Sequence, residues 1–187
     1  IIGIAVMFLG GTQFRWIAIL GVIGVVAGIA LIYISGHGLD RITSFLAPKD
    51  VITDDNWQTV QGLYAISSGG MFGLGFGESR LKYGYVSQPQ NDFIFPIICE
   101  ELGSIIGIIV VFGYMVMLYL VLRVAKSTYN IRDSILCYGV FGYMLAHILI
   151  NLLGVLGLIP LTGVPLPFLS YGGSYALSLI VGLFIVH

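Results

Sequence analysis

Long apolar runs separated by short polar segments dominate the pattern of this chain and predict membrane-spanning helices. A run of about 18 or more apolar residues is long enough to cross a hydrocarbon core of roughly 30 Å. Five segments form such a run or part of one, at residues 1–9, 17–34, 93–122, 133–156 and 174–187. We therefore expect an all-α, polytopic transmembrane helix bundle with about four to five spanning helices.

The longest polar stretch, residues 37–91, predicts a large loop that contains short helices. Behind a potential cap at Asp54–Asn56, apolar side chains recur at helical spacing at Trp57, Val60 and Tyr64. We expect a short helix there that lies on the membrane surface and ends near residues 67–70. No strand precedes the alternating glycines at 73, 75 and 77, so they predict a flexible or tightly turning backbone rather than a nucleotide-binding loop.

The composition fits a chain whose solvent is largely lipid, and its few charges orient the spans. Only 9% of the residues are charged, 58% are hydrophobic, and the mean hydropathy is +1.01. The basic residues of the short segments 10–15 and 123–132 place those segments in the cytoplasm. The segment 157–173 has no Lys or Arg, so it is expected outside together with residues 37–91. A formal net charge of −1 gives no field that would attract nucleic acid.

Both ends of the chain fall inside apolar runs, so we expect a piece of a larger membrane protein, incomplete at both ends and inactive alone. The two cysteines, Cys99 and Cys137, lie in apolar stretches. They lack the spacing of a metal site or a redox pair, and we interpret both as buried packing residues.

Asp92 is the first candidate for chemistry, since a carboxylate where a polar loop meets an apolar helix is costly to keep. One interpretation makes it the N-cap of that helix. The other directs it into a cavity. In a regular helix the ring of Pro96 would clash with the carbonyl of Asp92, so the helix either starts nearer Pro96 or kinks there. Both alternatives stay open at this point.

Glu100 and Glu101 are supporting candidates deeper in the same apolar run. At about 1.5 Å per residue they lie roughly 12 Å and 13.5 Å beyond Asp92. At about 100° per residue, only one of them can share a face with Asp92. An acid at such depth needs a partner, water or a proton. An ion pair with a basic residue on a missing helix and a direct catalytic role are the two alternatives.

Three further polar groups are weighed against structural explanations. Arg80 and Lys82 suit a phosphate or pyrophosphate, or else belong to a solvated loop. Polar residues at i, i+4 and i+8 form a stripe that favours helix packing, at Tyr143, His147 and Asn151. The Pro- and Gly-rich segment 160–174 has free backbone N–H groups, and irregular backbone at membrane depth has to be buried in protein or line a cavity. We therefore interpret that segment as a wall of a site.

Two stretches resemble a known family. The run Pro-Leu-Pro-Phe-Leu-Ser-Tyr-Gly-Gly-Ser at 165–174 resembles a signature of the SEDS membrane proteins. The run Asn-Asp-Phe-Ile-Phe at 91–95, followed by Glu-Glu-Leu-Gly at 100–103, resembles a second family motif, and residues 41–45 and 61–70 also fit. The resemblance covers nearly the whole chain. The sequence at 160–165 is most similar to that of the division members of the family, as distinct from the elongation and sporulation members.

This resemblance implies a ten-helix enzyme of the bacterial cytoplasmic membrane. Such an enzyme polymerises lipid II into peptidoglycan glycan strands at the outer face during septal synthesis. It implies Asp92 as the catalytic base, although residues 87–90 lack a glutamate that the family pattern has there. Candidate substrate contacts are then Arg80, Lys82, Ser170, Gly172, Gly173 and Ser174, and candidate supporting residues are Gln61, Glu100 and Glu101.

The same resemblance implies partners and leaves alternatives. The partners are lipid II, the nascent glycan strand, a class B penicillin-binding transpeptidase and other division proteins of the membrane. No cofactor is assigned; a divalent cation, Mg²⁺ or Mn²⁺, is one of the groups that suit a leaving pyrophosphate. The alternatives are a lipid II flippase, an elongation-type polymerase, and a scaffold whose helices dock a partner.

Overall fold

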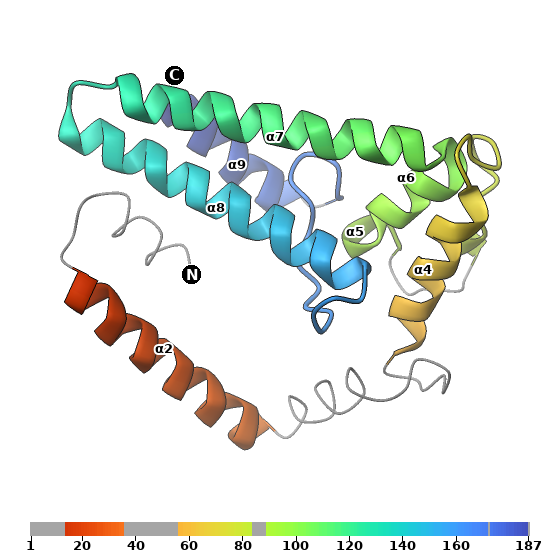
Figure 1. The fold of residues 1–187 in the computed structure, drawn as a ribbon, viewed down its shortest axis with the longest axis horizontal. Coiled ribbons are helices and arrows are strands. Elements are labelled where there is room, and N and C mark those ends of the chain that lie inside the picture. The colour runs from red at the N-terminus through yellow and green to blue at the C-terminus, as the bar shows by residue number, and fades with distance from the viewer. Residues whose placement is uncertain (1–13, 36–55, 84–88, 172, 187) are drawn as a thin grey trace. The chain divides into compact units, whose positions relative to one another are not determined.

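The computed structural model describes residues 14–35, 56–83, 89–171 and 173–186, and these residues form helices and connecting segments without a β-strand (Figure 1). The expected span at 1–9, the cap residues Asp54 and Asp55, and Gly172 lie outside the described residues. The chain divides into two compact units. Unit 1 comprises residues 1–39, 116–146 and 174–187, and unit 2 comprises residues 40–115 and 147–173.

Seven α-helices and one short 3₁₀ helix follow one another in the described part of the chain. Their bounds are α2 Phe14–Ser35, α4 Trp57–Gly69, η1 Arg80–Tyr83, α5 Pro89–Asp92, α6 Ile94–Leu102, α7 Ser104–Ser127, α8 Ile131–Val155 and α9 Gly173–Val186. The short helix predicted after Asp54–Asn56 is thus present as α4, whose N-cap Asn56 makes no side-chain cap hydrogen bond.

Two of these helices, α7 and α8, are long and apolar enough to cross a membrane. Their most apolar 18-residue windows have a mean hydropathy of 2.7 and 1.8. Both are longer than the roughly 20 residues that a span needs. The prediction of an all-helical membrane protein is therefore confirmed in this coarse form for the described residues.

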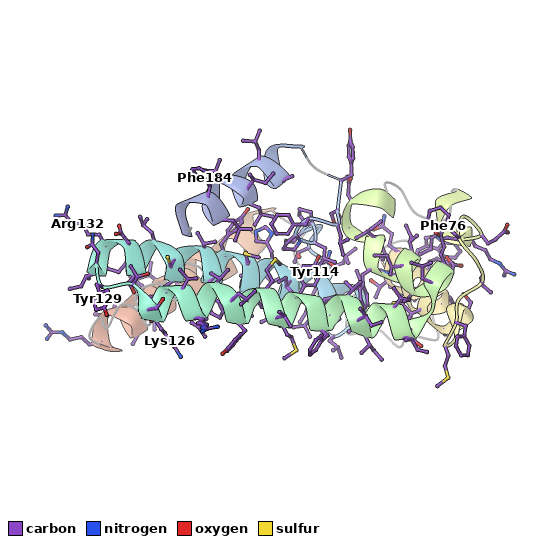
Figure 2. The ribbon with its side chains drawn as sticks, turned by 90° about the horizontal axis from the view of Figure 1, so that it is seen from above. Phe76, Tyr114, Lys126, Tyr129, Arg132 and Phe184 are labelled. Carbon is purple, nitrogen blue, oxygen red and sulfur yellow. The ribbon has the colours of Figure 1, made fainter. Side chains whose placement is uncertain are left out.

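Unit 1 is held together by aliphatic packing between parts of α7, α8 and α9. Its buried side chains are Val121, Ala125, Cys137, Met144 and Leu179. A Cβ added at Gly182 of α9 would lie 3.4 Å from Val140 of α8, so these two helices approach closely. Figure 2 shows the polar residues of the α7–α8 turn, among them Lys126 and Arg132.

In unit 2 the apolar run that was predicted as one span is divided into two helices. A continuous helix over 93–122 was expected, but the structure ends α6 at Leu102 and begins α7 at Ser104. Between them Gly103 has a φ of 88°, which L side chains rarely adopt. The backbone of residues 71–73 also lies directly against Gly103, where a Cβ would collide with the Met71 carbonyl. A contact with a segment about thirty residues earlier therefore breaks the apolar run.

That earlier segment, Gly70–Gly77, is called the glycine loop below. The amides of Leu74 and Gly75 donate to the carbonyls of Glu100 and Glu101, at 2.9 Å and 3.0 Å. The amide of Ser104 donates to the Gly70 carbonyl at 2.9 Å. The loop thereby satisfies carbonyls that the end of α6 leaves without helical partners. The predicted tight turn is present, and it serves as the cap of α6.

Candidate functional site

Asp92 is the last residue of the four-residue helix α5, directly before α6 begins at Ile94. The N-cap of α6 is Phe93, and no side chain makes a cap hydrogen bond there. The capping interpretation of Asp92 is therefore wrong. Pro96 falls in the first turn of α6, where its missing N–H costs nothing, so the helix starts near Pro96 as one of the two alternatives required.

The main chain of Asp92 is fixed from α8. Asn151, which is 4% exposed, donates from Nδ2 to the Asp92 carbonyl at 2.9 Å and to the Val164 carbonyl at 2.7 Å. One amide group thus ties the segment before α6 to the segment after α8. Because one buried side chain bonds to both, the position of Asp92 is coupled to that of the wall segment 160–171.

The carboxylate of Asp92 faces that wall. An ideal Cβ at Gly163 would lie only 3.2 Å from Asp92 Oδ2, and Gly163 has a φ of 66°. No described residue makes an ion pair or hydrogen bond with the carboxylate. The group is half-buried, and desolvation raises the pKa of Asp92 above its usual value. A partly desolvated carboxylate with open lone pairs is suited to accept a proton.

The wall segment has a defined shape. The Leu166 amide donates to Ser170 Oγ at 2.8 Å, and the Ser170 amide donates to the Leu166 carbonyl at 3.1 Å. Between them Phe168 has a φ of 61°. The hydroxyl of Tyr114 on α7 donates to the Pro167 carbonyl. These bonds hold an irregular segment that has few regular backbone partners of its own.

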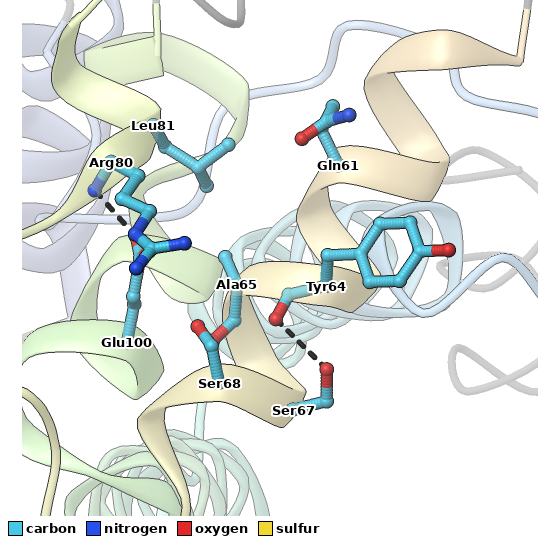
Figure 3. A pocket seen from close by; sticks show the side chains of 8 residues that line it. All are labelled: Gln61, Tyr64, Ala65, Ser67, Ser68, Arg80, Leu81 and Glu100. Atoms are coloured by element: carbon cyan, nitrogen blue, oxygen red, sulfur yellow. Dashed lines mark hydrogen bonds between the residues drawn. The ribbon is translucent and has the colours of Figure 1, made fainter.

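Glu100 lies at the far end of α6 from Asp92, in a separate polar pocket (Figure 3). Its side chain is 1% exposed and accepts hydrogen bonds from Ser79 Oγ at 2.6 Å and from the Arg80 amide at 3.2 Å. The pocket has a volume of about 290 Å³. Its lining residues are Gln61, Tyr64, Ala65, Ser67, Ser68, Arg80, Leu81 and Glu100.

The polar partners of Glu100 come from this chain. From the sequence, an ion pair with a basic residue on a missing helix was one alternative for Glu100, and the hydrogen bonds from Ser79 and the Arg80 amide were not predicted. In Figure 3 the Arg80 guanidinium lies above Glu100. The dashed line marks the hydrogen bond that the Arg80 backbone N–H donates to the Glu100 carboxylate. Because Ser79 and the Arg80 amide compensate the buried carboxylate, Glu100 acts as the structural anchor of the η1 segment.

The structure brings some candidate residues together and separates others. Asp92 lies with Gly163 and Asn151, whereas Arg80, Gln61 and Glu100 line the second pocket. Glu101 is buried at 5% exposure. Ser170 serves the turn of the wall segment. Lys82 is in η1 and Gly173 begins α9, while the side chains of Lys82 and Ser174 lie outside what the structure describes.

Three residues that position the site were not predicted as such. Ser79, Tyr114 and the amide of Asn151 each make a long-range hydrogen bond to a candidate segment. The sequence did signal Asn151, as the last member of the polar stripe on α8, and the packing role predicted for that stripe matches its bonds. Ser79 and Tyr114 have no comparable signal in the sequence.

Metal binding was tested on the donor groups. Within the described residues, no three or more His, Cys, Asp or Glu side chains gather into a group suited to a metal ion. The carboxylates of Asp92 and Glu100 lie at opposite ends of α6 and do not share a site. These residues do not fit a metal centre, and no step of the chemistry below runs through one.

Comparisons with known proteins agree with an integral membrane protein built of helices. The family model described as "Cell cycle protein", of the FtsW, RodA and SpoVE type, matches residues 1–187. The chain therefore belongs to the FtsW/RodA/SpoVE family. It spans about half the length of the curated relatives that it matches.

Three similar proteins illustrate the family. Stage V sporulation protein E of Bacillus subtilis is 39% identical over 91% of this chain and 47% of its own length. The probable peptidoglycan glycosyltransferase FtsW of Trichlorobacter lovleyi is 36% identical over 98% of this chain and 47% of its own length. A chain of a solved peptidoglycan synthase complex matches with a TM-score of 0.67 at 21% identity, covering 97% of this chain and 50% of that one, which shows a shared fold.

Proposed function

We propose that the whole protein is a peptidoglycan glycosyltransferase that polymerises lipid II into glycan strands for septal wall synthesis. Relatives at 36% and 42% identity have the name probable peptidoglycan glycosyltransferase FtsW. The observation that carries the proposal for this chain is the half-buried carboxylate of Asp92, which makes no hydrogen bond to a described residue and faces Gly163.

In this proposal Asp92 is the general base. Its carboxylate takes the proton from the 4-hydroxyl of the acceptor sugar, and the oxygen attacks the anomeric carbon of the donor chain. A C–O bond forms, the bond from the anomeric carbon to the pyrophosphate oxygen breaks, and undecaprenyl pyrophosphate leaves with its electron pair. The configuration inverts because attack and departure occur on opposite faces. A positioned base contributes about 10²–10⁴-fold to such a rate.

The remaining candidates serve substrate binding in this proposal. The Arg80 guanidinium at the second pocket, with Lys82 of the same 3₁₀ helix, is suited to an anionic group of the lipid-linked substrate. Ser170 shapes the wall beside the sugar, and we assign the binding of polar groups of the sugar to the Gly172, Gly173 and Ser174 that follow it in the sequence. Gln61, Glu100 and Glu101 support these positions from α4 and α6.

The proposed topology follows from the charges. The basic α7–α8 turn lies in the cytoplasm, and the segments 37–91 and 157–173 face outside, where the polymer is made. A class B penicillin-binding protein is the proposed transpeptidase partner. A chain of similar fold belongs to a solved peptidoglycan synthase complex that coordinates polymerization and crosslinking.

The test is Asp92→Asn in the full-length protein, reconstituted with its partner and supplied with lipid II. The amide keeps the size of the side chain but cannot act as a base. We expect polymer formation to fall by about 10²-fold or more while lipid II binding is retained. Asp133→Asn on the exposed first turn of α8 is the matched control and is expected to polymerise normally. Normal polymerisation by Asp92→Asn would overturn the catalytic assignment.

The same assay separates the polymerase from a transporter. Polymer made from lipid II in detergent, where there is no second compartment, supports the enzyme. Translocation of lipid II in vesicles without any polymer would replace it with a flippase. In the detergent assay a docking scaffold would leave lipid II unchanged, with or without Asp92.

A further inference from the structure

The glycine loop exposes large apolar side chains. Phe72 and Phe76 are each 85% exposed, Met71 is 67% exposed and Leu74 is 45% exposed. Figure 2 shows Phe76 at the edge of this loop. Residues 69–77 contain no charged side chain. A cluster of exposed apolar residues this dense is a feature of surfaces that contact a partner or a membrane.

This exposure is not a sign of a loose segment. The loop is fixed by four backbone bonds, from the amides of Gly73, Leu74, Gly75 and Ser104. Ser104 Oγ adds a fifth bond, to the Gly70 carbonyl at 2.8 Å. The bonded partners Gly69, Glu100, Glu101 and Ser104 all lie in unit 2. The apolar side chains are therefore presented on a rigid support.

The support sets the level of the loop in the membrane. The helix α7 has 24 residues, and at about 1.5 Å per residue it is roughly 36 Å long. This exceeds a hydrocarbon core of about 30 Å by a few ångströms, so Ser104 at its start lies near the boundary of the core. Because Gly70 bonds directly to Ser104, the glycine loop lies at the same boundary.

The apolar surface also continues from the loop onto the spanning helix. Beyond the glycine loop, exposed apolar side chains follow at the end of α6 and along the first turns of α7, at Leu102, Ile105, Ile108 and Ile109. The α7 side chains belong to a helix whose most apolar 18-residue window has a mean hydropathy of 2.7. A surface continuous with a spanning helix at the boundary level has the bilayer as its neighbour.

We propose that the glycine loop is a membrane anchor that inserts Phe72, Met71 and Phe76 into the lipid interface of the leaflet where α7 begins. This inference goes beyond the glycosyltransferase proposal and does not depend on it. The same loop caps α6, so the anchor holds the Glu100 end of that helix at a fixed depth. A lipid-linked substrate would then meet the Arg80 pocket at the level of its own headgroup.

The test uses the full-length protein in lipid vesicles with spin labels on single cysteines. Labels go to Phe72→Cys and Phe76→Cys, and the matched control is Tyr129→Cys, a fully exposed aromatic in the polar turn between α7 and α8. All other cysteines of the full-length protein are replaced first, among them the buried Cys99 and Cys137 of this chain. We expect labels at 72 and 76 to favour oxygen over a water-soluble nickel chelate several-fold more than the label at 129.

Two results would overturn the anchor. Labels at 72 and 76 that are as open to the nickel chelate as the control would place the loop in water. Labels immobilised and closed to both reagents would place it under protein, either a missing part of this chain or a partner. If a cysteine variant fails to fold, Phe72→Trp as the single tryptophan of the full-length protein decides the question, with all others, among them Trp16 and Trp57, changed to Phe. Its fluorescence is quenched by brominated lipids only if the loop is inserted.

Discussion

The interactions that stabilise unit 1 internally differ from those that stabilise unit 2. Unit 1 packs five aliphatic or small side chains between α7, α8 and α9, and its buried core contains no charged group. Unit 2 buries Ser79, Glu100, Glu101, Asn151 and Ser170 and joins its segments through hydrogen bonds and close glycine contacts. The first kind of packing has no preferred direction, whereas the second kind fixes orientation.

This difference separates a frame from a site. Apolar packing tolerates an exchange of similar volume, and in lipid it is supplemented by close helix approach such as that at Gly182. Directional bonds require particular atoms at particular positions, as at Asn151 and Glu100. The segments that carry Asp92 and the wall are irregular, so directional bonds add to the burial of apolar side chains such as Phe93 and Leu166 in holding them. Unit 2 should therefore be far more sensitive to conservative substitutions than unit 1.

The largest effect is expected at the break between α6 and α7. Gly103→Ala places a Cβ on a residue with a φ of 88° and into the Met71 carbonyl, and backbone on both sides cannot give way. We expect a loss of about 3 kcal/mol in the free energy of unfolding. Thermal unfolding of the purified full-length protein in detergent measures this loss.

Gly113→Ala on α7 is the matched control for that break, because nothing in the structure lies within 4 Å of the added Cβ. It is expected to leave stability unchanged or slightly raised, since Ala favours a helix over Gly. Equal losses at the two glycines would mean that helix α7, rather than the glycine loop, sets the sensitivity of this region.

The next largest effect is expected at the amide that joins Asp92 to the wall. Asn151→Leu keeps the volume but leaves the carbonyls of Asp92 and Val164 without their donor. We expect a loss of about 2.5 kcal/mol, since buried acceptors left unsatisfied cost about 1–3 kcal/mol. Under the proposed function, a lower turnover with little change in the affinity for lipid II should accompany it, because the proposed base and its wall lose their common tether.

Met144→Leu in the core of unit 1 is the comparison for Asn151→Leu. Met144 is fully buried, and a volume-conserving exchange of this kind costs less than about 1.5 kcal/mol. It should not change turnover. A Met144→Leu variant that is the less stable of the two would contradict the division between frame and site.

A smaller effect is expected at the buried carboxylate of Glu100. Ser79→Ala removes the hydroxyl donor at 2.6 Å and leaves the Arg80 amide as the remaining described donor. Hydrogen bonds to charged groups contribute about 1.5–3 kcal/mol, and we expect a loss of about 2 kcal/mol. Ser67→Ala on the rim of the same pocket removes only an exposed bond to the Tyr64 carbonyl and should cost less than about 0.5 kcal/mol. Melting curves of the two variants decide this comparison.

The fold was predictable where it depends on local pattern. The apolar runs predicted the helices now seen as α2, α7 and α8, and helical spacing predicted α4. Pro96 indicated that the helix after Asp92 either starts near that proline or kinks there, and α6 begins at Ile94. In each case the signal lies within one segment, because length, periodicity and proline geometry are properties of neighbouring residues.

The site was predictable only in part, because its geometry depends on contacts between distant segments. Nothing near Gly103 in the sequence shows that residues 71–73 will pack against it and divide the expected span. Likewise the partners of Glu100 lie 20 and 21 residues away, and those of Asn151 lie 59 and 13 residues away. Asp92 and Glu100 are both acidic residues at one apolar run and look alike in the sequence. The fold shows that Glu100 accepts two hydrogen bonds from its own unit, whereas the Asp92 carboxylate faces the wall.

The smallest expected effect is a change in the free energy of unfolding on Asp→Asn exchange, and its sign should differ between the two units. Desolvation raises the pKa of Asp92 above 3.8, so the folded protein holds that proton more tightly than the unfolded chain. At neutral pH the ionised carboxylate therefore opposes folding, and Asp92→Asn should stabilise the protein. The gain should be about 0.5 kcal/mol, because water screens a half-buried group. The gain should shrink as the pH falls through the raised pKa and vanish below about 3.8.

Asp133→Asn makes the same exchange in unit 1, and there the sign should reverse. Asp133 is exposed in the first turn of α8, where a negative charge interacts favourably with the helix dipole. Its loss should cost about 0.3–1 kcal/mol at low salt. Melting temperatures of both variants at pH 7 and at decreasing pH provide the measurement. If Asp92→Asn also destabilised the protein at pH 7, its carboxylate would be a structural group with a partner. Burial of the Asp92 carboxylate would then not lower the stability of the folded protein.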